Sequence, residues 1–167
     1  MKLAKQFRIS SGRGPRLNYS RNYKMTIETK ILRQGDEHLL QCLAPGVFDD
    51  PLIPQITQEF LSDSRHHLAV AIEGGLVIGF ASAVHYIHPD KPQPEMWINE
   101  VGVAPDYQRR GVGQAILRAL LALARDLNCS EAWVLTERPN TPAMKLYSSL
   151  NGIEATNVGA MFTFFLD

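Results

Sequence analysis

Apolar and polar residues alternate along residues 26–32, which predicts a half-buried β-strand near the start of the patterned part of the chain. Residues 66–87 contain two mostly apolar runs, and the turn between them, at Glu73, Gly74 and Gly75, predicts a hairpin. Residues 95–103, 131–136 and 159–166 also have strand character. The pattern therefore predicts six strands, of which the second and third form the hairpin.

Helical spacing is clearest in the run that follows Gly113 and ends near Asn128. Its apolar residues recur at the positions of a core-facing helix stripe: Leu117, Leu120, Leu121 and Ala124. Shorter helices are expected at residues 37–44, 55–61 and 141–150. Because strands first pair locally and then alternate with helices, the predicted fold class is α/β or α+β with a mixed sheet.

The composition favours one globular domain. Hydrophobic residues make up 45% and charged residues 20% of the 167 residues, which argues against a disordered chain or a coiled coil. The longest nearly apolar run, residues 115–124, is interrupted by Arg118 and falls short of the roughly 20 residues that span a bilayer, so no membrane partner is expected. Cys42 and Cys129 have no metal-like spacing and fit buried thiols in a reducing, cytoplasmic setting.

The formal net charge of zero conceals an uneven distribution. Residues 1–24 hold seven Lys and Arg and no acid, leaving 10 of the 17 basic residues against all 17 acids in residues 25–167, a net charge of −7. The basic stretch lacks the apolar segment of a secretory signal. We expect residues 1–24 to be a disordered tail of vector or upstream origin rather than a nucleic-acid-binding arm, and residues 25–167 to be a single acidic domain that attracts cations.

The segment "VAPDYQRRGVG", residues 103–113, joins a predicted strand to the long helix. The first N–H groups of a helix lack internal partners, and Gly111 and Gly113 let an anion approach the backbone, while Arg109 and Arg110 add positive charge. No Lys-Ser or Lys-Thr follows, as a Walker loop requires, and Ile116 stands where a dinucleotide fingerprint needs glycine. On these residues alone, a pyrophosphate site and a helix start without ligand both remain open.

The longer segment "VGVAPDYQRRGVGQAIL" resembles the Q/R-x-x-G-x-G/A signature of the GNAT N-acetyltransferase superfamily, and the resemblance extends from about residue 26 to the C-terminus. It implies a mixed sheet of six to seven strands flanked by about four helices and splayed between the fourth and fifth strands. It also implies acetyl-CoA as co-substrate, with the pyrophosphate held around Gln108 by the backbone amides of Arg109, Arg110, Gly111, Val112, Gly113 and Gln114.

The resemblance further implies that the pantetheine arm of coenzyme A pairs with the backbone of Val101, Gly102 and Val103. An amide near Val101 would then polarise the thioester carbonyl. In "TERPNTPAMKLYSSLNG", Asn140 matches the family's pantetheine-binding asparagine and Tyr147 the tyrosine near the departing sulfur. Packing of Tyr147 on one helix face is the alternative.

Glu100 is the candidate general base. An amine attacks only when neutral, so an enzyme working near pH 7 needs a base or a site that lowers the amine's pKa. Glu100 directly precedes the expected pairing segment and therefore lies close to the reaction centre. An ordinary strand carboxylate is the alternative.

The acceptor is predicted from a narrower resemblance. The stretch "WINEVGV" is similar to the fourth strand of aminoglycoside 3-N-acetyltransferases, which implies a cationic antibiotic as substrate and a role in resistance. Acceptor contacts are expected from Asp49, Asp50, His85, Glu95 and Glu137. A polyamine, another small amine, or a protein amine remains an alternative, as does a coenzyme A-binding module without catalysis. No metal is expected, because the histidines lack a recognisable ligand spacing, and relatives suggest a homodimer.

Overall fold

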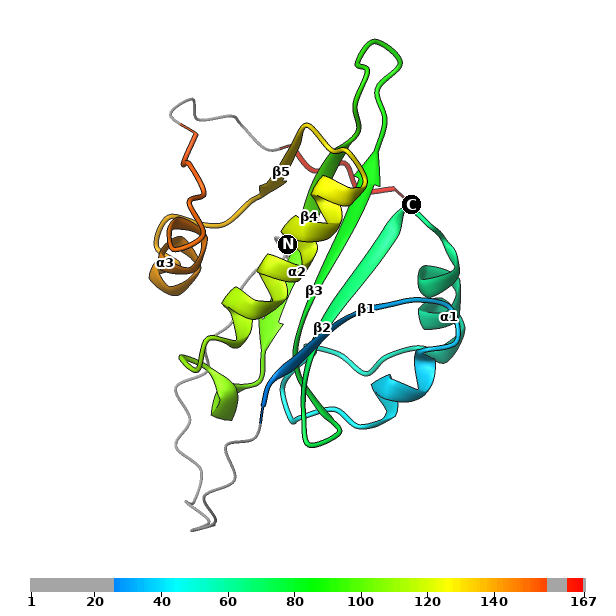
Figure 1. Cartoon of the computed structure of the whole chain (residues 1–167), viewed down its shortest axis with the longest axis vertical. Helices are drawn as coiled ribbons and strands as arrows, with labels where there is room; N and C mark the ends of the chain where they lie inside the picture. The colour runs from blue at the N-terminus through cyan, green and yellow to red at the C-terminus, as the bar shows by residue number, and fades with distance from the viewer. Residues whose placement is uncertain (1–25, 156–161, 167) are drawn as a thin grey trace.

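The computed structural model describes residues 26–155 and 162–166. Its centre is a five-stranded sheet in the order β1-β2-β3-β4-β5 (Figure 1). Its strands are β1 (Glu28–Leu32), β2 (His66–Glu73), β3 (Leu76–Tyr86), β4 (Glu95–Val103) and β5 (Glu131–Val134). The first four strands pair antiparallel with their neighbours, and β5 pairs parallel with β4. The sheet is therefore mixed, as predicted.

Three α-helices and two 3₁₀ turns connect the strands. The helices are α1 (Pro54–Ser62), α2 (Val112–Asp126) and α3 (Thr141–Ser148), and the turns are η1 (Glu37–Gln41) and η2 (Pro105–Tyr107). In Figure 1, α2 crosses in front of the strands and α3 stands apart from it, beyond β5. No helix in the described ranges is long and apolar enough to cross a membrane.

The two faces of the sheet are covered differently. Gly79 of β3 lets α2 approach closely, because a β-carbon there would meet side-chain atoms of Val112 at 2.9 Å and Ile116 at 3.0 Å. On the opposite face, Phe48 from the loop after η1 stacks on Phe80 with ring centroids 3.9 Å apart. The α2 residues that are buried in the core are Val112, Ile116, Leu117, Leu120 and Ala124. Leu121, which the apolar spacing had predicted to be in the core, is only half-buried.

One predicted helix and one predicted strand are not formed as expected, so the described part of the structure has fewer helices and strands than the sequence predicts. Residues 37–44 form only the short 3₁₀ turn η1, which buries Leu40 alone. The final strand predicted at residues 159–166 is not formed over residues 162–166, whose apolar side chains are 75–94% exposed; residues 159–161 lie outside the described part. Apolar character alone does not supply the neighbouring strand that a ladder needs, so the described sheet has five strands rather than six or seven.

β4 parts from β5 halfway along its length. The last pair between them joins Ile98 to Val134, and β4 then continues for five residues to Val103. On its other side β4 stays paired with β3, but the register shifts by one residue, so that Asn99 is an extra, bulged residue between the pairs of Ile98 and Glu100. The splay expected between the fourth and fifth strands is thus present.

His67 should make the fold sensitive to acid. Its ring is 7% exposed, and Nε2 lies 2.8 Å from Nδ1 of His85. Burial, and then the neighbouring His85 and His66, lower the pKa of His67 to about 4. Because the unfolded chain binds this proton near pH 6.5, the folded state should lose stability as the pH falls from about 6.5 to 4, by on the order of 2–3 kcal/mol.

Urea unfolding of the wild type and His67→Gln at pH 7 and pH 4.5 measures this contribution. The variant should lose less free energy of unfolding between the two pH values than the wild type does. His38→Gln, at an exposed position, is the matched control and should behave like the wild type. An equal acid loss in His67→Gln and the wild type would contradict the assignment.

Candidate active site

The turn between β4 and α2 leaves the start of the helix without a side-chain cap. Arg109 and Gly111 both have left-handed backbone conformations, with φ of 59° and 82°. Gly111 caps α2 without a side chain, so the N–H groups of the first turn of the helix point outward without a side-chain cap. Such a run of backbone donors at the positive end of a helix dipole binds phosphate groups well.

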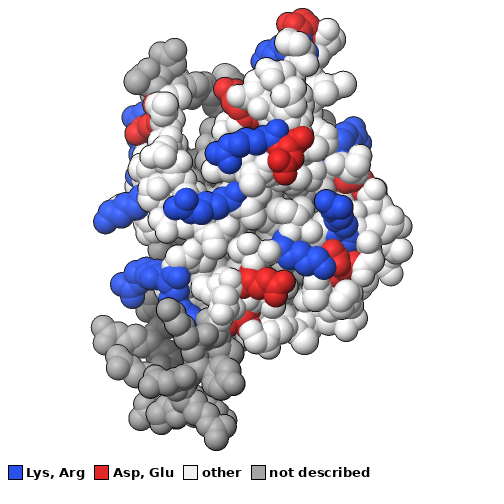
Figure 2. Space-filling model, in the orientation of Figure 1, with Lys and Arg blue, Asp and Glu red and all other residues white. Residues whose placement is uncertain are grey.

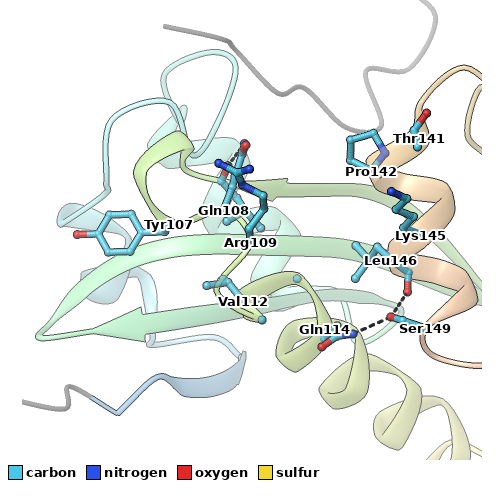
Figure 3. Close-up of a pocket in the computed structure, with 13 residues that line it drawn as sticks. Tyr107, Gln108, Arg109, Val112, Gln114, Thr141, Pro142, Lys145, Leu146 and Ser149 are labelled. Atoms are coloured by element: carbon cyan, nitrogen blue, oxygen red, sulfur yellow. Dashed lines mark hydrogen bonds between the residues drawn. The ribbon is translucent and has the colours of Figure 1, made fainter. Parts of the chain in front are cut away.

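A cavity of about 440 Å³ lies between this turn and α3. Figure 3 shows the side chains of the two elements facing each other across it. Its walls are mainly apolar, with polar groups at the rim. The lining residues are Val103, Tyr107, Gln108, Arg109, Gly111, Val112, Gly113, Gln114, Thr141, Pro142, Lys145, Leu146 and Ser149.

The α3 wall of this cavity was not predicted from the sequence. Thr141, Lys145 and Ser149 recur every four residues, which places them on one face of α3. The family resemblance had placed Asn140 and Tyr147 of this segment near coenzyme A, but it did not single out this face of the helix. Lys145 and Arg109 bring positive charge from both sides, and Figure 2 shows basic side chains around the part of the surface where the turn and α3 meet. The cavity therefore suits a ligand with an apolar body and an anionic group.

Arg110 differs from Arg109 in being held by the protein itself. Its Nη2 donates to Oε1 of Glu73 at 2.5 Å, and the Glu73 side chain is 6% exposed at the end of β2. The guanidinium also lies 5.1 Å from the ring centroid of Tyr107. Arg110 therefore anchors the turn to the β2–β3 hairpin, and it does not line the cavity.

Two glutamines brace the same turn. Gln108 Nε2 donates to the carbonyl oxygen of Val103 at 3.1 Å, closing the loop around η2. Gln114 Nε2 donates to Ser149 Oγ at 2.7 Å, and Ser149 Oγ donates in turn to the Leu146 carbonyl, which ties α2 to α3 (Figure 3). Gly113 allows this approach, since a β-carbon there would lie 3.1 Å from Leu146.

The bulge at Asn99 decides where Glu100 lies. Directly paired residues on neighbouring strands share a face, and Glu100 pairs with Ser82 while Trp97 pairs with Val84. Ser82 and Val84 are two apart on β3 and therefore share one face, opposite to α2. Glu100 consequently lies on the face covered by the loop after η1, beside the point where β4 and β5 separate.

Three buried polar atoms in the described ranges have neither a hydrogen-bond partner nor an ion-pair partner: Trp97 Nε1 on β4, Thr136 Oγ1 just after β5 and Tyr147 Oη on α3. A fourth, His88 Nε2, has no hydrogen bond but lies 3.6 Å from Glu95 Oε1. Because buried polar atoms are rarely left unpaired, Trp97, Thr136 and Tyr147 are candidates for contact with a ligand.

Tyr147 is placed to remain protonated. Burial raises the pKa of Tyr147 to about 12, so its phenol stays neutral and able to donate a proton throughout the physiological range.

Asn140 has a structural role, since it caps α3 by accepting a hydrogen bond from the Ala143 amide at 3.3 Å. The cap orients the helix that carries Tyr147 and Lys145.

The residues expected to bind the acceptor are not brought together as one set. Asp49, Asp50 and Glu137 are exposed in loops. Glu95 is buried and already accepts hydrogen bonds from Lys91 and Tyr86. These two bonds, that of Lys91 first, hold the pKa of Glu95 below its usual range. His85 pairs with Met96, on the face that carries α2, and contacts His67 rather than the face of Glu100.

Comparison with known proteins agrees with this architecture. The profile of the acetyltransferase (GNAT) family matches residues 36–152. The N-alpha-acetyltransferase RimI of Mycobacterium tuberculosis is 32% identical over 104 residues, covering 62% of this chain and 63% of that protein. The chain thus spans less than two thirds of this relative, and 47% of the N-acetyltransferase 8 of Rattus norvegicus.

Solved structures share the fold. An aminoglycoside acetyltransferase, HMB0005, from an uncultured soil metagenomic sample superposes with a TM-score of 0.72 at 19% identity, covering 84% of this chain and all of that one. A second aminoglycoside acetyltransferase, meta-AAC0020 in complex with sisomicin, has a TM-score of 0.68 at 16% identity. The match covers 83% of this chain and 97% of that one. The splayed sheet, the glycine-containing turn before α2 and the family match together lead to one conclusion: the chain belongs to the acetyltransferase (GNAT) family.

Proposed function

We propose that the protein transfers an acetyl group from acetyl-CoA to a primary amine in a ternary complex. The observation that carries this proposal is the position of the anion-binding turn at the end of the part of β4 that has parted from β5. A ligand with its pyrophosphate on the turn can extend its pantetheine arm along Val101, Gly102 and Val103 as an added strand. The apolar cavity with Arg109 and Lys145 suits the rest of coenzyme A.

The reaction follows from the groups around the split. Glu100 accepts the proton of the amine, whose lone pair attacks the thioester carbonyl carbon. The backbone amide near Val101 donates to the oxyanion that forms. When the carbon–sulfur bond breaks, the phenol of Tyr147 donates its proton to the departing thiolate and then regains a proton, equivalent to the one that the new amide nitrogen releases. The products are the acetylated amine and coenzyme A.

Thiol release from acetyl-CoA in the presence and absence of amines tests the proposal. Amine-dependent release of coenzyme A is expected, together with an acetylated product of the correct mass. Saturable coenzyme A binding without any amine-dependent turnover would instead support a non-catalytic binding module, and absence of coenzyme A binding would overturn both.

The leading acceptor is an aminoglycoside acetylated at its 3-amino group. The "WINEVGV" strand, the acidic character of residues 25–167 and the structural likeness to aminoglycoside acetyltransferases support it. A protein N-terminal amine is the second candidate, because the relative at 32% identity is named an N-alpha-acetyltransferase. A panel of aminoglycosides, polyamines and peptides ranked by kcat/KM separates them, and NMR of the product identifies the acetylated nitrogen.

Tyr147→Phe should separate catalysis from packing. Its hydroxyl is buried without a partner, so removing it should leave the free energy of unfolding nearly unchanged. If the phenol protonates the leaving thiolate, kcat should fall by about 10²-fold. Urea unfolding and thiol-release kinetics on the same preparation measure both effects, and an unchanged kcat would remove Tyr147 from the mechanism.

A further inference from the structure

The only two tryptophans of the chain lie side by side where β4 and β5 still pair. Trp97 and Trp133 are direct neighbours in the parallel register, and their rings are nearly parallel, with an interplanar angle of 7° and centroids 5.3 Å apart. Both side chains are partly exposed rather than buried. Their places on predicted strands favour a core role for both residues, whereas in the structure they form a partly exposed aromatic pair.

This indole pair shares its face with the proposed base. Trp97 pairs with Val84 and Glu100 with Ser82, and the bulge at Asn99 is what puts both side chains on the same face. Ser82 and Val84 are two residues apart, a distance of about 7 Å along a strand. A cyclic molecule whose amino group reached Glu100 would therefore bring a neighbouring ring close to the indoles.

Hydrogen bonds hold one edge of the pair in place. Trp133 Nε1 donates to Tyr86 Oη at 2.8 Å, and Tyr86 Oη donates to Glu95 Oε2 at 2.8 Å. Lys91, from the proline-rich loop before β4, donates to the other oxygen of Glu95. This chain fixes the Trp133 ring, and the Trp97 indole N–H is buried without a partner in the described structure. Trp133 is thus held in place by hydrogen bonds, and Trp97 is stacked against it.

The loop that carries Asp49 and Asp50 lies at the opposite end of the same face. Phe48 stacks on Phe80, which is two residues before Ser82 on β3, and Asp49 and Asp50 follow Phe48 directly. Glu100 therefore lies between an acidic loop and the indole pair. Carboxylates and aromatic faces both attract cations.

We propose that the stacked pair of Trp97 and Trp133 forms an aromatic wall of the acceptor site, which selects cyclic amines that carry further positive charge, such as amino sugars, over flexible linear amines. One ring of the acceptor packs on the indoles while its reacting amine lies at Glu100 and a second cation lies near Asp49 and Asp50. A rigid ring loses less conformational freedom on this fixed surface than a linear chain does. The inference rests on the proposed acetyl transfer for its biological meaning, but binding to the indoles can be measured without turnover.

Intrinsic fluorescence gives a direct test, because excitation at the indole band reports these two residues alone. Titration of the full chain with sisomicin should produce a saturable change in emission, and spermidine should produce a much weaker one at the same concentration. If sisomicin produced no saturable change, or spermidine produced an equal one, the proposed role of Trp97 and Trp133 in the acceptor site would be wrong. This result does not depend on whether the protein turns over acetyl-CoA.

Kinetics supply the second arm. Trp97→Leu should raise KM for sisomicin by about 10-fold, while KM for acetyl-CoA changes less than twofold. Trp97→Phe, which keeps an aromatic face, should recover most of the loss, and thermal unfolding of both variants controls for folding. A parallel rise in KM for acetyl-CoA, or an equal loss for sisomicin and spermidine, would show that the tryptophans only maintain the strand pair. If the wild type acetylates no amine, the acetyl-transfer proposal fails. The fluorescence titration still decides whether Trp97 and Trp133 bind cyclic amines.

Discussion

Replacing Glu100 by glutamine is expected to lower kcat for amine acetylation by about 10²–10³-fold at pH 7, because glutamine cannot accept the proton of the attacking amine. The loss should shrink as the pH rises, since a growing fraction of the amine is then neutral without help. The wild-type rate should depend less steeply on pH over the same range. Stopped thiol-release assays between pH 6 and pH 9.5 at saturating acetyl-CoA measure both profiles.

Glu59→Gln is the matched control for this substitution. Glu59 is an exposed residue of α1, so its replacement makes the same chemical change away from the split in the sheet. The control should retain wild-type kcat at every pH. If Glu100→Gln keeps the wild-type rate and pH profile, Glu100 is not the base, and the amine must lose its proton by another route.

Adding a single methyl group at Gly102 should be the most disruptive small change in β4. A β-carbon at this position would lie 2.5 Å from Phe80 Cε1 and 2.7 Å from the carbonyl oxygen of Val47. The oxygen belongs to the backbone and cannot rotate away, so Gly102→Ala should cost about 2–3 kcal/mol in free energy of unfolding. The expected fall in Tm is about 5–10 °C.

The same substitution should weaken acetyl-CoA binding, because Gly102 is the centre of the segment proposed to pair with pantetheine. A double-mutant cycle with Phe80→Leu tests the cause, since shortening the ring should relieve part of the Gly102→Ala cost. Strict additivity of the two changes in Tm would indicate that the Phe80 contact is not what destabilises the variant. A Tm equal to that of the wild type would contradict the close packing of β4 against the loop after η1.

Much of the architecture could be predicted locally. The alternating run at residues 95–103 is β4 with the predicted bounds, and the glycine pair at 74–75 joins β2 to β3. The helix after the glycine-containing turn also lies where its apolar spacing placed it. These features depend on neighbouring residues and on φ values that glycine adopts readily, which is why a single sequence carries them.

The arrangement of the site depended on contacts between distant residues. Simple alternation along β4 puts Trp97 and Glu100 on opposite faces, and one bulged residue, Asn99, reverses that assignment. The α3 wall of the cavity is near the α2 turn because Gly113 admits Leu146 and Gln114 bonds to Ser149, 35 positions away.

Contacts between distant residues also decide which charged side chains are paired within the protein. Arg110 is anchored by Glu73, 37 positions away, and Glu95 is neutralised by Lys91 and bonded by Tyr86, so neither group is simply a surface charge. By itself, the sequence determined most of the element types, the glycine-containing turn before α2 and the family, because periodicity and turn chemistry are local properties. Only the tertiary structure decided which side chains share a face, which charges are already paired and that the tryptophans are partly exposed, because register and packing join residues that no local pattern connects.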